Sequence, residues 1–95
     1  MTTRLTWDEA KRAANLAKHG LDFADAAWVL DSVHRMDLYA ERGGELRVQS
    51  FSYVVDVLAV LTVVHTARDG AARVISFRPA SGDECEVYYD WLESE

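Results

Sequence analysis

The chain has 95 residues, of which 49% are hydrophobic and 27% charged, so the composition excludes a disordered protein and indicates one domain over residues 1–95. Sixteen acidic residues against ten lysines and arginines give a net charge of −6, which disfavours broad nucleic-acid binding. The single cysteine, Cys85, excludes an internal disulfide. The most apolar run is too short to span a bilayer, and the first residues do not form a signal peptide, so we expect a soluble cytoplasmic protein without a membrane partner.

Residues 6–20 predict the first helix. Thr6 and Glu9 have the spacing of a capping box, and Gly20 suits the left-handed position that ends a helix. The apolar residues expected on the buried face are Trp7, Ala10, Ala14, Ala17 and Leu21.

Residues 22–30 predict a second, shorter helix, with Asp22 as its N-cap. Its expected apolar face is Phe23, Ala26, Ala27 and Leu30.

The hydrophobic period then changes to that of strands. The predicted strands are residues 34–40, 45–53, 55–67 and 72–78. In residues 55–67 both the odd- and the even-numbered positions are largely apolar, which is typical of a central strand covered on both sides. Asp69 and Gly70 predict a tight hairpin between the last two strands.

The chain ends in a predicted helix, because Ser81 and Glu84 again have capping-box spacing after Pro79. Its apolar face is Cys85, Tyr88, Tyr89 and Leu92. The whole pattern predicts a compact α+β domain with two N-terminal helices, an antiparallel sheet of about four strands and a C-terminal helix.

Three arginines stand close together in this acidic chain, at Arg68, Arg73 and Arg78. Arginine presents a fork of donors that matches carboxylate or phosphate. The candidate partners are therefore a phosphate-bearing ligand, the acidic C-terminal tail, or solvent on a strand surface. The last thirteen residues contain six acids and no base.

Strand register decides which arginines act together. A two-residue hairpin loop would place Arg68 and Arg73 on one face with Thr66, and Arg78 with His65 on the other. A three-residue loop with a bulge would group Arg68 with Arg78, and Arg73 with His65. No simple register puts all three arginines on one face, and we expect the bulged loop.

Several segments resemble the BrnT family of bacterial toxins. They are residues 6–31 with the run "NLAKHGLDF", Glu45 and Arg47, and residues 63–89 with the run "RVISFR". The resemblance covers most of the chain, from about Trp7 to Tyr89. It implies a fold similar to RelE-type toxins, metal-independent endoribonuclease activity without a cofactor, and an RNA substrate. It also implies a cognate, BrnA-like DNA-binding antitoxin, with which the chain would regulate its own operon as a dimer or a toxin–antitoxin heterotetramer.

RNA cleavage without a metal uses the ribose 2′-hydroxyl as nucleophile and needs a proton acceptor, a proton donor and a cation for the developing charge. The candidate catalytic residues are Arg68, Arg78, His65 and Tyr88, and the candidate RNA-binding residues are Arg73, Lys18 and His19. These residues also have structural alternatives. His65 can be a hydrogen-bonded residue of a buried strand, Tyr88 can be a core aromatic residue, and His19 can interact with the C-terminus of the first helix. Spacing typical of a metal site is absent from the sequence.

A second function remains open, in which the chain is a catalytically weak binding module within an autoregulatory antitoxin–repressor complex. Pro79 and Asp83 favour it, since they stand where the BrnT pattern usually has bases. Under either function we expect the exposed aromatic residues of the last helix to anchor a protein partner.

Overall fold

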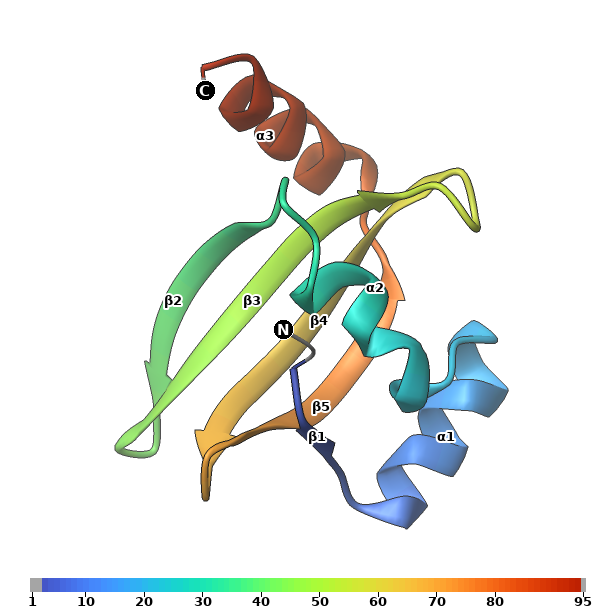
Figure 1. Ribbon diagram of the computed structural model, residues 1–95, viewed down its shortest axis with the longest axis vertical. Helices are drawn as coiled ribbons and strands as arrows, with labels where there is room; N and C mark the ends of the chain where they lie inside the picture. The colour runs from blue at the N-terminus through green and yellow to red at the C-terminus, as the bar shows by residue number, and fades with distance from the viewer. Residues whose placement is uncertain (1–2, 95) are drawn as a thin grey trace.

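The computed structural model describes residues 3–94. The elements in chain order are β1 (Leu5–Thr6), α1 (Glu9–His19), the 3₁₀ helix η1 (Phe23–Ala26), α2 (Ala27–Leu30), β2 (Met36–Arg42), β3 (Glu45–Val54), β4 (Ala59–Arg68), β5 (Ala71–Pro79) and α3 (Gly82–Glu93). They form one five-stranded sheet in the order β1-β5-β4-β3-β2 (Figure 1). Every helix of the described residues is too short or too polar to cross a bilayer.

The α+β prediction is confirmed, but the expected four antiparallel strands and two N-terminal helices were incomplete. A two-residue strand, β1, pairs parallel to β5 and makes the sheet mixed. The second predicted helix divides into η1 and α2. Strand β1 is too short to show an alternating pattern, so hydrophobic periodicity could not reveal it.

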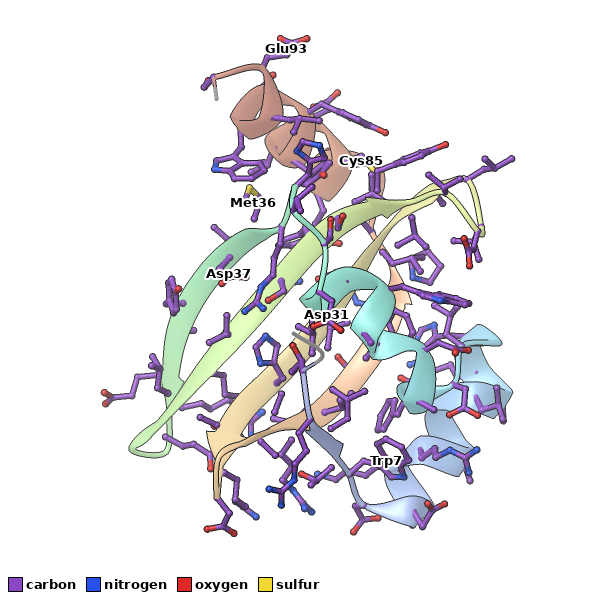
Figure 2. The ribbon with its side chains drawn as sticks, in the orientation of Figure 1. Trp7, Asp31, Met36, Asp37, Cys85 and Glu93 are labelled. Atoms are coloured by element: carbon purple, nitrogen blue, oxygen red, sulfur yellow. The ribbon has the colours of Figure 1, made fainter. Side chains whose placement is uncertain are left out.

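Helices lie on both faces of the sheet. The face that carries Leu61 and Val63 packs against η1 and α2, and Phe23 is fully buried there. The opposite face packs only at one end, where Tyr88 of α3 is buried with Phe51 and its neighbours. Figure 1 shows α2 in front of the sheet, α1 beside β5 and α3 beyond the upper end of the sheet. Figure 2 shows Met36 of β2 close to α3, which carries Cys85. Most of the second face is therefore free of helices.

Strand β4 is the central strand, as predicted for residues 55–67, but it begins only at Ala59. Val54 of β3 pairs with Ala59, and residues 55–58 form the hairpin loop between them. An apolar loop has the composition of a strand, so the sequence did not separate the two.

The hairpin between β4 and β5 has the two-residue loop that Asp-Gly predicts, and the expected three-residue loop was wrong. Asp69 and Gly70 both have left-handed φ angles, 53° and 76°, and Arg68 pairs directly with Ala71. Such a turn matches the right-handed twist of the strands.

A bulge lies further along the same pair of strands. Val64 pairs with Ser76 and His65 with Val74, so Ile75 has no opposite residue. After the bulge, the odd- and even-numbered residues of β5 exchange the faces to which they point. Residues 73, 76 and 78 therefore share one face. Our expectation that no register groups all three arginines was wrong. It considered a bulge only at the hairpin loop, whereas the bulge lies within β5 between Arg73 and Arg78.

Predicted helix ends are confirmed at three of four places. Gly20 ends α1 with a φ of 70°, Asp22 caps η1 by accepting from the amide of Ala24, and Ser81 forms a capping box with Glu84. The start of α1 differs, since Asp8 is its N-cap and accepts from the amide of Lys11.

The buried face of α1 also differs from the prediction. Ala10, Ala14 and Ala17 are exposed, and the one buried residue of the helix is Asn15. Its amide nitrogen donates to the carbonyl of Phe77 at 2.7 Å, and its oxygen accepts from the amide of the same residue at 3.1 Å. Since β1 pairs with β5 only at residues 72 and 73, Asn15 satisfies the edge of β5 beyond the end of β1.

Asn15→Ala should lower the free energy of unfolding by about 2 kcal/mol or more, because it leaves the buried amide and carbonyl of Phe77 without partners. Urea unfolding would measure it. Lys11→Ala, at an exposed position of the same helix, is the matched control and should change stability by less than about 0.5 kcal/mol. Equal effects would show that Asn15 does not support β5.

Candidate nucleic-acid interface

Five arginines share the sheet face that the N-terminal helices leave free. Pairing registers place on this face Arg42, Arg47, Arg68, Arg73 and Arg78. An open hollow of about 260 Å³ lies between β2, β3 and β4, with Arg42, Arg47 and Val64 in its lining. We call this surface the arginine face. It gives the acidic chain a local concentration of positive charge.

Of the three arginines that the sequence singled out, Arg68 and Arg78 have acidic partners and Arg73 has none among residues 3–94, as is also true of Arg42 on the same face. Arg73 is half-buried and lies opposite Thr66, whose hydroxyl donates to the carbonyl of Leu46 at 2.8 Å. With its guanidinium unneutralised, Arg73 can accept a phosphate group without first releasing a carboxylate.

Glu45 lies between two of the other arginines. Its carboxylate is 3.5 Å from a terminal nitrogen of Arg68 and 3.7 Å from Nε of Arg47. The second distance is too long for a hydrogen bond, and the Nε atom of Arg47 is buried without a hydrogen-bond partner in the described structure. The arginine face thus contains one carboxylate held loosely by two cations.

Arg78 is held much more tightly. Two of its nitrogens donate to the two oxygens of Glu84, at 2.7 and 2.9 Å. Glu84 also accepts from Gln49 at 3.1 Å and from the amide of Ser81 at 2.8 Å. The hydrogen bonds from Arg78 lower the pKa of Glu84 to about 2, and the same pair raises the pKa of Arg78. Of the three partners considered for the arginines, the acidic tail occupies Arg78.

The ionised Glu84 should stabilise the protein above its unfolded pKa of about 4.5, and this stabilisation should disappear as the pH falls towards 2. The difference in unfolding free energy between the wild type and Glu84→Gln should therefore be largest near neutral pH and shrink between about pH 4.5 and 2. Denaturant unfolding at several pH values would measure it.

Glu86→Gln is the matched control, since Glu86 is exposed two residues along the same helix. It should change the free energy of unfolding at neutral pH by less than about 0.5 kcal/mol, because an exposed side chain is altered. A Glu84→Gln difference that stays constant down to pH 2 would contradict the tie between α3 and β5.

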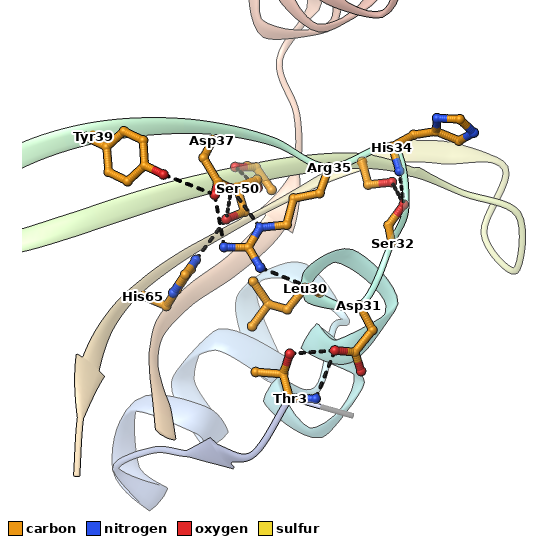
Figure 3. Close-up of polar contacts among 12 residues, drawn as sticks. Thr3, Leu30, Asp31, Ser32, His34, Arg35, Asp37, Tyr39, Ser50 and His65 are labelled. Atoms are coloured by element: carbon orange, nitrogen blue, oxygen red, sulfur yellow. Dashed lines mark hydrogen bonds and ion pairs between the residues drawn. The ribbon is translucent and has the colours of Figure 1, made fainter. Parts of the chain in front are cut away.

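His65 lies on the opposite face of the sheet from the arginine face. Figure 3 shows its contact with Ser50, with Nε2 2.8 Å from the Ser50 hydroxyl oxygen. That hydroxyl donates to Asp37 at 2.6 Å, and Asp37 also accepts two hydrogen bonds from Arg35, at 2.7 and 3.0 Å. Because the single hydroxyl proton of Ser50 is directed at Asp37, Nε2 of His65 is assigned the proton and donates to the Ser50 oxygen.

This network keeps His65 neutral. Burial, helped by the charge of Arg35, lowers the pKa of His65 to about 4. Burial opposes ionisation of Asp37, but hydrogen bonds from Arg35 and Ser50 outweigh it and lower the pKa of Asp37. The network joins β2, β3 and β4, which suits a structural histidine better than a proton acceptor for RNA on the other face.

Of the other candidates, Tyr88 packs on the same sheet face as the arginines, in the cluster with Phe51 at the α3 end. Tyr88 is fully buried, and its hydroxyl donates to the carbonyl of His34 at 2.8 Å and accepts from the amide of Tyr53. Lys18 and His19 lie in the last turn of α1. Of the seven predicted site residues, the structure brings together the three arginines only.

The sequence interpretation did not propose site roles for Glu45, Arg42 or Arg47. Glu45 and Arg47 have the same parity along β3, which was a usable signal once the strand was known. Within residues 3–94, no group of three or more His, Cys, Asp or Glu side chains could hold a metal ion.

Residues 7–84 match the family described as the ribonuclease toxin BrnT of type II toxin–antitoxin systems. No curated protein matches the chain significantly. Family membership implies a ribonuclease toxin with an RNA substrate and an antitoxin partner. The match covers most of the sequence, and the chain belongs to the BrnT family.

Proposed function

We propose that this BrnT-family toxin cleaves RNA on its arginine face, through attack of the ribose 2′-hydroxyl on the adjacent phosphate and without a metal ion. One observation carries the proposal: Arg68, Arg73 and Arg78 share one sheet face that the N-terminal helices leave free. A cluster of fixed guanidinium groups stabilises the charge that develops on a phosphate in the transition state.

In this proposal Arg73 binds the scissile phosphate, because of Arg68, Arg73 and Arg78 it alone has no carboxylate partner among the described residues. Glu45 accepts the 2′ proton, since it is the carboxylate loosely held at 3.5 Å by Arg68. As the P–O5′ bond breaks, the leaving 5′ oxygen takes a proton from water on this open face. Glu84 is unsuited to accepting the 2′ proton, because a pKa of about 2 makes it a weak base. Arg78 orients the RNA backbone from its fixed position beside Glu84.

Three further expectations remain predictions: the RelE-like fold, the cytoplasmic location, and neutralisation by a BrnA-like DNA-binding antitoxin in a heterotetramer. Catalytic roles for His65 and Tyr88, and RNA contacts from Lys18 and His19, find no support in their positions.

Arg73→Ala should reduce RNA cleavage by on the order of 10²–10³, because a phosphate-binding donor is lost. Purified wild-type and variant chains would be compared on one RNA, with growth after induction as a second readout. Lys18→Ala is the matched control, a cation at the end of α1. We expect it to cleave like the wild type, and thermal unfolding should show both variants folded.

Glu45→Gln should lower cleavage because the proton acceptor is lost, whereas binding of RNA should persist. Cleavage by the wild type should also survive excess EDTA. An Arg73→Ala chain as active as the wild type, or complete loss of activity in EDTA, would contradict the proposed mechanism.

The binding-module alternative is supported by one observation, the occupation of Arg78 by Glu84. A wild-type chain that binds its antitoxin but neither cleaves RNA nor arrests growth would establish it in place of the ribonuclease.

A further inference from the structure

The loop between β3 and β4 exposes apolar side chains where turns usually carry polar ones. Val55 is 72% exposed and Leu58 is 74% exposed. Leu58 also has a left-handed φ of 55°, a conformation that favours glycine or asparagine over leucine. Solvent and backbone geometry both disfavour leucine here, so neither explains it.

A hollow of about 520 Å³ lies directly beside this loop, between β3 and α3. Its lining includes Tyr53, Val55, Tyr89 and Leu92. Tyr89 is 44% exposed, so its ring is available to a partner. Together with the loop, this hollow forms an apolar surface at the end of β3 where α3 lies, and we call it the hairpin-tip surface.

Acidic residues surround the hairpin-tip surface. Asp56 is exposed in the loop itself, and Glu86 and Glu93 stand three residues before and four residues after Tyr89, on the same stripe of α3. The described lining of the hollow contains no lysine or arginine. The charge around the apolar centre is therefore of one sign.

We propose that the hairpin-tip surface binds the antitoxin, through a segment that inserts a large apolar side chain into the hollow and flanks it with lysine or arginine. Family membership implies the antitoxin, and the acidic rim selects the basic flanks. A second copy of this chain fits less well, because it would bring Glu86 and Glu93 against an equally acidic surface.

This assignment rests on the antitoxin partner and not on RNA cleavage. Arg47 and Arg73 lie towards one end of the sheet and the hairpin-tip surface lies at the other, whereas Arg78, opposite Thr62, is the arginine nearer to that surface. Antitoxin affinity and RNA cleavage can consequently be measured and lost independently.

The test uses calorimetric titration of the full chain with the antitoxin encoded by the adjacent gene. Val55→Asp should weaken binding by about 30-fold or more, the effect of losing an interface hot spot. Leu58→Asn should also weaken binding, and it should raise the melting temperature of the free chain, since asparagine tolerates the left-handed conformation better. If Leu58 only supported the fold, its replacement would not weaken antitoxin binding while raising the melting temperature.

Leu46→Asp is the matched control, because Leu46 is also an exposed leucine but lies at the start of β3. It should leave the affinity unchanged. The double variant Glu86→Lys with Glu93→Lys should weaken binding and flatten its dependence on salt concentration. RNA cleavage by all these variants without antitoxin should match the wild type.

Wild-type affinity in Val55→Asp and Leu58→Asn, or no complex with the product of the adjacent gene, would overturn the assignment. Self-association of the free chain that Leu58→Asn abolishes would assign the surface to a second copy instead. If Arg73→Ala loses RNA cleavage but binds the antitoxin normally, the result supports separate surfaces for RNA and antitoxin.

Discussion

The bulge at Ile75 determines what each face of the sheet can do. Val74 and Phe77 are both buried in the core beneath the N-terminal helices, although they stand three residues apart. In a regular strand, residues three apart point to opposite faces. The unpaired Ile75 shifts the alternation of side chains by one residue, so that Phe77 enters the core and Arg78 joins Arg73 on the other face. If Ile75 instead paired opposite Val64 as in a regular strand, Phe77 would lie on the arginine face and Arg78 would enter the core.

The same bulge resolves how an acidic chain can act on a polyanion. Net charge governs weak binding at a distance, but the phosphate contact depends on charges within a few ångströms. The arginine face gathers five arginines, whereas the acids of the tail lie mainly on α3. Glu84 is the exception, and it holds Arg78 in one orientation. The tail therefore limits the basic surface at one end without covering Arg73.

Local chemistry made much of the fold predictable. Gly20, the Asp69–Gly70 turn and the Ser81 capping box each require a particular backbone conformation, and the sequence identifies them directly. The arginine face could not be predicted, because a single unpaired residue reverses the orientation of every later side chain in a strand. Asn15 was also missed, since an alanine-rich helix gives a false apolar face. His65 is a catalytic candidate by residue type, whereas its burial beside Ser50 and Arg35 favours a structural role.

Two local violations of ordinary folding rules coincide with the two proposed surfaces. The Nε atom of Arg47 is buried without a hydrogen bond on the arginine face, and Leu58 adopts a left-handed conformation at the hairpin-tip surface. Each costs stability in the free protein, on the order of 1–3 kcal/mol. Rearrangement of Arg47 towards a bound RNA phosphate would satisfy the first, and a partner that buries the leucine side chain would offset the second. Costs of this kind persist where binding compensates them, which makes both positions better guides to function than the buried His65 network, whose groups are already satisfied.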